Sequence, residues 1–217
     1  MSENLDKYYS IKGPSSGEFK DRGSKFFGYL YPVTSLEEFE KHLIDLRKEH
    51  LKARHYCYAY RLNFEEELFR MNDDGEPSGT AGKPIYGQLL KHNLFDVACV
   101  VVRYFGGTKL GTSGLINAYK LSALDAIQQA DIEDRYLTHS IKFEFDYAQM
   151  GEIMELVKSQ NIFISSKTFE QTPILVLNIP KSETELTLRQ LKAKLLKVDL
   201  EYIDIKSKVP GCTFSYL

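Results

Sequence analysis

Glycine dominates residues 106–114, which read Gly-Gly-Thr-Lys-Leu-Gly-Thr-Ser-Gly. Because glycine has no side chain, backbone NH groups in such a loop can approach a ligand closely, and loops of this kind bind anions. No Asp or Glu occurs between Val97 and Leu124, whereas Arg103 and Lys109 carry positive charge. Phosphate is therefore the first ligand to consider for this stretch.

The residues predicted to hold phosphate lie in the glycine stretch, just before it, and in an earlier polar loop. They are Arg103, Gly106, Gly107, Lys109, Gly111, Ser113, Gly114, Lys83 and Thr80. Arg103 and Lys109 would supply charge, the glycine amides would donate hydrogen bonds, and Ser113 would cap the following helix. The alternative is that the glycines serve only a tight turn. A Walker A loop is excluded because Thr112 stands where its lysine should be, and no GxGxxG fingerprint is present.

The earlier loop spans residues 72–84 and contains almost no apolar side chain. Three of its residues are acids, Asp73, Asp74 and Glu76. They could hold a divalent ion, but the EF-hand spacing is absent, so capping and solvation of the loop is the favoured interpretation and we expect no metal or other cofactor. The loop is either a connector or a second wall beside the phosphate. Thr80 or Ser78 is expected to cap the helix that follows.

His55 begins an aromatic stretch and is the one residue that suggests a general base. Nucleophilic catalysis needs a nucleophile and an orienting acid beside the base, and the nearby sequence shows no such combination. We therefore favour a hydrogen-bonded structural role for His55 and assign no catalytic residue.

Apolar periodicity and turn residues predict the elements that position these loops. The run from Asp96 to Phe105 predicts a strand covered on both faces, and a helix should begin near Thr112 or Ser113. Upstream, the pattern predicts strands at 8–12, 18–21, 25–33, 54–62 and 65–71, and a helix capped by Ser35 with Glu38 at the capping-box position. Arg22, Ser24 and Lys25 form a small polar cluster beside Gly23 that could touch an anion, although decoration of a surface turn is the favoured role.

A charged connector at 131–135 predicts a domain boundary, and the chain after it has a cleaner pattern. This part predicts strands at 138–147, 162–169, 172–179 and 198–206, and helices at 148–160 and 182–196, the second with a Ser182/Glu185 capping box. The order βαββαβ is that of a ferredoxin-like domain. Its surface is expected to serve docking or RNA contact.

Composition is that of an ordinary globular protein, with 217 residues, 43% hydrophobic content and a net charge of −2. This balance excludes a globally basic nucleic-acid binder but not a local basic site. The three cysteines are widely separated, so neither zinc nor a disulfide framework is expected. The N-terminal residues lack an apolar signal segment and no run is long enough to span a membrane, so we expect a cytoplasmic protein with no membrane partner.

Two long blocks, residues 73–84 and 100–111, strongly resemble the IMPACT family, in its bacterial YigZ branch. The resemblance covers nearly the whole chain. It implies an α+β protein of two domains: residues 1–136 as a two-layer α/β domain similar to domain IV of elongation factor G, and residues 137–217 as a ferredoxin-like domain similar to its domain V. One departure is visible, because similar bacterial proteins usually have a basic residue where this chain has Asn117.

The resemblance extends to eukaryotic relatives, and these proteins regulate translation. The leading hypothesis is therefore a cytoplasmic protein that binds RNA or the ribosome without enzymatic turnover. The first alternative is an enzyme that acts on a small phosphorylated ligand, with an acid of the 72–84 loop and Mg²⁺. The second is an interaction module for a protein partner of the translation machinery, such as a translation factor.

Overall fold

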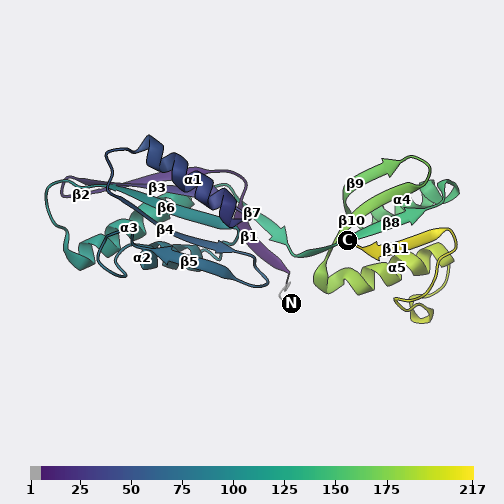
Figure 1. Cartoon of the computed structure of the whole chain (residues 1–217). Helices are drawn as coiled ribbons and strands as arrows, with labels where there is room; N and C mark the ends of the chain where they lie inside the picture. Colours follow the sequence, from purple (N-terminus) through teal and green to yellow (C-terminus); the bar gives the residue numbers. More distant parts are fainter. Residues whose placement is uncertain (1–5) are drawn as a thin grey trace. The chain divides into compact units, whose positions relative to one another are not determined.

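The computed structural model describes residues 6–217 and separates into two compact units, each of mixed α and β structure (Figure 1). One unit comprises residues 8–135 and the other residues 136–217 with Asp6 and Lys7. The expected two-domain α+β class is thereby confirmed. The expectation that the first residues carry no signal segment lies largely outside the described residues. No helix among residues 6–217 is both long and apolar enough to cross a membrane.

An antiparallel five-stranded sheet forms the centre of the 8–135 unit. In sheet order its strands are β2 (Ser15–Asp21), β3 (Ser24–Pro32), β6 (Val97–Tyr104), β4 (His55–Leu62) and β5 (Leu68–Asn72). Strand β6 is central, and its residues 97–102 are fully buried, as the continuous apolar run predicted. A neighbouring strand on each side and helices on both faces exclude water from it.

Three helices cover this sheet, one on one face and two on the other (Figure 1). They are α1 (Leu36–Glu49), α2 (Gly82–Lys91) and α3 (Gly111–Gln128). Helix α1 packs Phe39 and Leu46 against the tyrosine-rich face of β4, whereas α2 and α3 share the core on the opposite face. The unit therefore has three layers, one more than the two expected. Ser35 caps α1 as predicted, because its side chain accepts the NH of Glu38.

The charged segment expected to be a connector is a strand. Residues Ile132–Tyr136 form β7, which pairs with β1 (Lys7–Ile11) in a separate two-stranded sheet. Exposed and half-buried side chains alternate along β7, the period of a strand at the surface, and this explains how a polar sequence forms one.

The second unit has the ferredoxin-like fold. Its elements are β8 (Thr138–Phe145), α4 (Met150–Ser159), β9 (Phe163–Phe169), β10 (Pro173–Pro180), α5 (Thr184–Leu196) and β11 (Cys212–Tyr216). The strands are antiparallel in the order β11-β8-β10-β9, and one face of the sheet packs on the two helices. The element order βαββαβ is thus confirmed.

Two details of this unit differ from the expectation. The fourth strand was predicted at 198–206, but that segment is a loop with a short 3-10 turn, and Cys212–Tyr216 takes its place. Arg189 and Lys192 of α5 donate to backbone carbonyls of this loop, so those carbonyls are not available to a sheet. The predicted Ser182/Glu185 capping box is also absent, because Ser182 donates its NH and hydroxyl to the Asp6 carboxylate.

Candidate nucleic-acid interface

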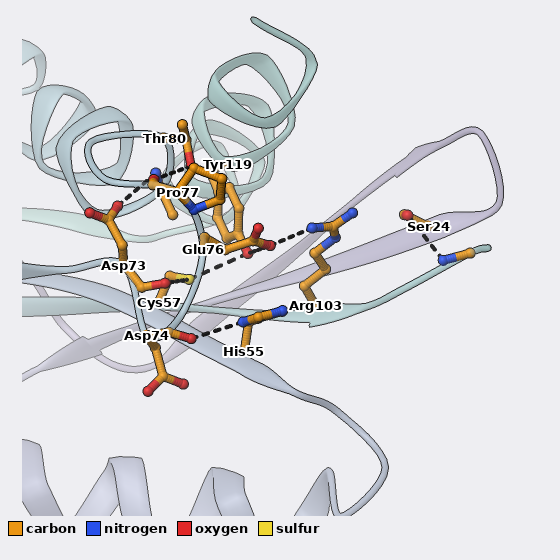
Figure 2. A network of polar contacts seen from close by, with 12 residues as sticks. Ser24, His55, Cys57, Asp73, Asp74, Glu76, Pro77, Thr80, Arg103 and Tyr119 are labelled. Atoms are coloured by element: carbon orange, nitrogen blue, oxygen red, sulfur yellow. Dashed lines mark hydrogen bonds and ion pairs between the residues drawn. The ribbon is translucent and has the colours of Figure 1, made fainter. Parts of the chain in front are cut away.

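Two polar loops meet at the end of β6. The acid loop, residues 73–81, connects β5 to α2, and the glycine loop, residues 105–110, connects β6 to α3. Figure 2 shows the acid-loop residue Glu76 between Arg103 at the end of β6 and Tyr119 on α3. The two sequence blocks that are separated in the chain are therefore joined in space by side chains.

Arg103 forms a buried ion pair. Its Nη1 lies 2.5 Å from Oε1 of Glu76, and the two side chains are 6% and 4% exposed. The hydroxyl of Tyr119 donates to the same Glu76 oxygen at 2.8 Å. The sequence suggested that Arg103 supplies charge to a phosphate at the surface; the structure corrects this, because Arg103 shares its side of β6 with the core residues Val101 and Cys99 and its charge is neutralised by the protein.

Cys57 and Tyr119 extend this network into the core. The Cys57 thiol lies 3.0 Å from the carbonyl oxygen of Asp73 and 3.3 Å from the Tyr119 hydroxyl. Burial raises the pKa of the Cys57 thiol, and burial together with the neighbouring thiol raises the pKa of the Tyr119 hydroxyl. Both groups therefore remain protonated near neutral pH. They hold the acid loop to the sheet and helix, and neither is an activated nucleophile or base.

Asp73 fixes the acid loop and the start of α2. Its carboxylate accepts the NH groups of Gly79 at 2.8 Å and of Ala81 and Gly82 at 2.9 Å each. Thr80 is buried and donates its hydroxyl to the carbonyl of Pro77. The expectation that Thr80 or Ser78 caps α2 is thus wrong, because a carboxylate from the preceding loop satisfies these helix donors.

Asp74 attaches the same loop to β4 and α1. One carboxylate oxygen accepts the NH of Tyr56 at 2.7 Å, and the other lies 3.4 Å from the Arg47 guanidinium. The carbonyl of Asp74 lies 2.8 Å from Nδ1 of His55, and since a carbonyl only accepts, this nitrogen carries the proton. His55 has the structural role that the sequence favoured.

The three loop acids therefore point to three different sets of partners. Asp73 binds loop amides, Asp74 binds a strand amide, and Glu76 binds a guanidinium and a phenol. Within residues 6–217 no three His, Cys, Asp or Glu side chains are grouped so that they could hold a metal ion. The metal interpretation of these acids has no geometric support.

The glycine loop differs in how its backbone is used. Gly106 packs directly on the hairpin turn: a Cβ at 106 would lie 1.9 Å from the carbonyl carbon of Gly23, and the Gly106 NH donates to the Ser24 hydroxyl at 3.1 Å. This glycine is architectural, and its NH is not available to a ligand. Gly107 and Gly111 adopt positive φ angles of 85° and 72°, and no atom lies within 4 Å of where their Cβ would be. They face open space.

Past Gly106, the NH groups are free. Those of residues 107–110 donate to no atom within residues 6–217. Helix α3 then begins at Gly111 with Leu110 as N-cap, no side-chain cap and no acid in its first turn. Ser113 lies inside this turn and is exposed, so the prediction that it caps α3 is wrong. The loop and the first turn together present unpaired donors at the positive end of a helix dipole.

Three exposed cations accompany these donors. Lys109 lies in the glycine loop, and Arg22 and Lys25 flank the hairpin turn that the Gly23–Gly106 contact brings against it. Within residues 6–217 none of the three side chains forms an ion pair. The sequence favoured surface decoration for Arg22 and Lys25. The β3–β6 pairing, which places Lys25 opposite Tyr104 at the end of β6, is a tertiary contact that no local pattern shows. Here "cationic loop surface" means Arg22, Lys25, Lys109 and the backbone of residues 107–111.

The remaining predicted residues have other positions. Lys83 is exposed on the first turn of α2 and belongs to a different element from the cationic loop surface. Gly114 lies within α3, where a Cβ would approach that of Leu110. Taken together, the site and the fold define a two-domain α+β protein in which a glycine-loop unit is joined to a ferredoxin-like unit.

Comparison with known proteins assigns the chain to a family. The model of the Impact N-terminal domain matches residues 22–127. The IMPACT family member YvyE of Bacillus subtilis is 31% identical over 180 residues, which cover 83% of each chain. The IMPACT family member YigZ of Escherichia coli is 30% identical over 162 residues, covering 74% of this chain and 79% of that one. The chain therefore belongs to the IMPACT family.

A solved structure agrees with this assignment over most of the chain. The crystal structure of a protein described as hypothetical aligns with a TM-score of 0.63 and 27% identity. The alignment covers 88% of this chain and 92% of the other. The likeness thus extends over both units of the fold.

Proposed function

We propose that this protein binds RNA through the cationic loop surface and acts as a regulator of translation, without enzymatic turnover. The observation that carries the proposal is the Gly23–Gly106 contact, which brings the hairpin turn flanked by Arg22 and Lys25 against the loop that contains Lys109 and four backbone NH groups without a partner within residues 6–217. Unpaired amides and cations in one place are the donors that phosphate oxygens need.

Local charge supports a phosphate ligand even though the chain as a whole is slightly acidic. The stretch from Val97 to Leu124 contains no acid, and Glu76, the carboxylate that reaches the end of β6, is neutralised by Arg103. Asp21 precedes Arg22 in the hairpin, and the three cations Arg22, Lys25 and Lys109 outnumber it. Exposed charges act mainly within a Debye length of about 8 Å at physiological salt. A phosphate on this surface would therefore experience mostly the local positive charges.

The acid loop argues against the enzymatic alternative. Each of its carboxylates is engaged by the protein, and the buried thiol and phenol beside it remain protonated. A catalyst would need at least one acid, base or nucleophile free to meet substrate. The arrangement favours binding over chemistry.

The family supports the biological setting of the proposal. Eukaryotic members regulate translation, so ribosomal or messenger RNA in the cytoplasm is the RNA of interest, and a translation factor is the protein partner to consider. The ferredoxin-like unit would provide a second contact surface for the ribosome or that factor.

Fluorescence anisotropy with a labelled single-stranded RNA at low salt tests the proposal. The variant Arg22→Ala/Lys25→Ala/Lys109→Ala should bind about tenfold more weakly or worse, because three phosphate contacts are lost. A matched control, Lys41→Ala/Lys52→Ala/Lys91→Ala, removes the same charge from exposed positions on α1, the loop after it and α2. If RNA affinity falls equally in both variants, net charge rather than this surface explains the binding. If the unchanged protein binds no RNA, the proposal is refuted. A protein pulldown that survives nuclease would favour the interaction-module alternative.

A further inference from the structure

We infer that Phe105 is a stacking platform for an unpaired base, so that the RNA class this surface recognises is single-stranded. The inference deepens the proposed function and rests on it. Phe105 is the first residue after β6 and lies at the start of the glycine loop, directly before Gly106 and Gly107. The residue is 53% exposed. An aromatic side chain at that exposure is unusual in a loop whose other exposed residues are glycine, threonine and lysine, and this indicates a binding role.

Within residues 6–217 the Phe105 ring has no aromatic partner. None of the ring–ring contacts within residues 6–217 includes Phe105, whereas the similarly exposed Phe69 stacks on Tyr86 with centroids 5.1 Å apart. Phe69 is thus accounted for by packing within its own unit. Phe105 offers aromatic surface that no other ring of residues 6–217 covers.

The buried ion pair holds Phe105 in place. The Arg103 guanidinium lies 5.5 Å from the Phe105 ring centroid and 5.3 Å from that of Phe26, and Glu76 fixes its position from within the protein. A guanidinium at this distance attracts the ring electrostatically and limits its motion. This gives Arg103 a role at the surface that does not require it to contact phosphate: it is a positioning residue for the aromatic ring.

The surroundings of the ring match one nucleotide. A nucleotide combines a flat base with an anionic phosphate, and here the aromatic ring is followed by free amides at 107–110 and by Lys109. Lys25 pairs with Tyr104 on the α1 face of the sheet, the side opposite to Arg103 and Phe26, so Lys109 is the cation that directly follows the ring in the loop. Bases stack on aromatic side chains largely irrespective of sequence, and cations beside the ring bind the backbone.

Stacking on Phe105 requires a base that has left its helix. In a duplex each base is already stacked between neighbours, and its faces are covered. We therefore expect tight binding to single-stranded RNA, weaker binding to duplex RNA and little preference among bases. Such a ring could instead anchor a protein interface, but the cations and amides near it, which have no partner within residues 6–217, favour an anionic partner.

The chain contains no tryptophan, which allows a direct test. Phe105→Trp introduces a single indole, and a base stacked on it would quench its fluorescence. We expect quenching on titration with a 12-nucleotide single-stranded RNA, together with little or none with a duplex of the same length. The control is Phe69→Trp, an aromatic position of similar exposure on β5, which lies at the opposite edge of the sheet from β2 and should show no quenching. Labelled RNA in the same titrations reports binding independently of the indole.

The RNA affinities of two further Phe105 variants complete the test. Phe105→Ala should weaken single-stranded RNA binding by about fivefold to a hundredfold, the range found for one base stacked on an aromatic ring. Phe105→Leu keeps apolar bulk but removes the aromatic face, and it should lose nearly as much. Circular dichroism and thermal unfolding would verify that both are folded.

The outcomes separate the two proposals. If both variants bind RNA as the unchanged protein does and Phe105→Trp is not quenched, the stacking inference is overturned and RNA binding by the cationic loop surface stands. If the unchanged protein binds no RNA, the proposed function fails and the inference fails with it. If Phe105→Ala loses only a nuclease-resistant protein partner, the ring is a protein anchor and the inference is wrong.

Discussion

The acid loop and the glycine loop occupy equivalent positions in the chain but use their polar groups in opposite ways. Both are polar, rich in glycine, and placed between a strand and a helix. In the acid loop every carboxylate has a partner in the protein, and the loop closes one end of the core. In the glycine loop the amides of residues 107–110 and the side chain of Lys109 have no partner within residues 6–217. The polar groups of the acid loop are thus bound within the protein, whereas the NH groups of the glycine loop are available to a ligand.

This difference shows that a glycine-rich polar motif does not by itself indicate a ligand site. What matters is whether its hydrogen-bonding groups are consumed by the fold, because a buried polar group without a partner is costly and an exposed one is not. Changes in the acid loop should therefore appear as lost stability, and changes in the cationic loop surface as lost binding.

The largest effect on stability is expected from Arg103→Ala. It would leave the Glu76 carboxylate buried without its counter-charge, and breaking such a pair costs about 3–5 kcal/mol. Urea unfolding measures the loss. The double variant Arg103→Ala/Glu76→Ala should recover part of it, because no isolated charge remains. A loss below about 1 kcal/mol in the single variant would mean that the pair does not hold the loop.

The two adjacent glycines offer the next contrast. Gly106→Ala would force a methyl group into the backbone of Gly23 and should cost about 1–3 kcal/mol or more, as overpacking does. Gly107→Ala meets no atom but requires a positive φ, so a smaller cost of about 1 kcal/mol is expected. Thermal unfolding compares the two. Equal or reversed effects would contradict the assignment of Gly106 to architecture and Gly107 to the open surface.

Removal of the Asp73 carboxylate is expected to have an intermediate effect. Asp73→Ala deprives Gly79, Ala81 and Gly82 of their acceptor and should cost about 1–2 kcal/mol, as loss of a helix cap does. Asp131→Ala is the matched control, since Asp131 forms only an exposed pair with Lys12 and its loss should change stability by less than about 0.5 kcal/mol. RNA affinity of folded Asp73→Ala should be nearly unchanged.

The smallest stability effect belongs to the cationic loop surface. Arg22→Ala/Lys25→Ala/Lys109→Ala removes exposed side chains without ion pairs, so the free energy of unfolding should change by about 0.5 kcal/mol or less. Urea unfolding would measure this alongside RNA affinity. A large loss of stability would contradict the claim that these side chains serve binding rather than folding.

Local patterns predicted much of the fold. The apolar run of β6, the Ser35 cap and the βαββαβ order all depend on short-range sequence and were confirmed. Failures occurred where a distant residue decides the outcome. Segment 198–206 is a loop because α5 side chains take its carbonyls, and Ser182 does not cap α5 because Asp6 binds it.

The site shows the same limit. The sequence showed where the glycine loop lies and that acids are absent from its surroundings in the chain. It could not show that Arg103 points into the core toward a carboxylate 27 positions away. Nor could it show that Gly106 packs on Gly23 and so brings Arg22 and Lys25 to the loop. Strand pairing and side-chain direction, which are tertiary properties, decide which cations remain free.

The most direct measurement is the salt dependence of RNA affinity for the unchanged protein and for Arg22→Ala/Lys25→Ala/Lys109→Ala. Each phosphate contact to a single strand contributes about −0.7 to the slope of log affinity against log salt concentration. Three lost contacts should therefore make the slope shallower by about two. An unchanged slope, with both proteins folded, would contradict the claim that this surface is where RNA phosphates bind.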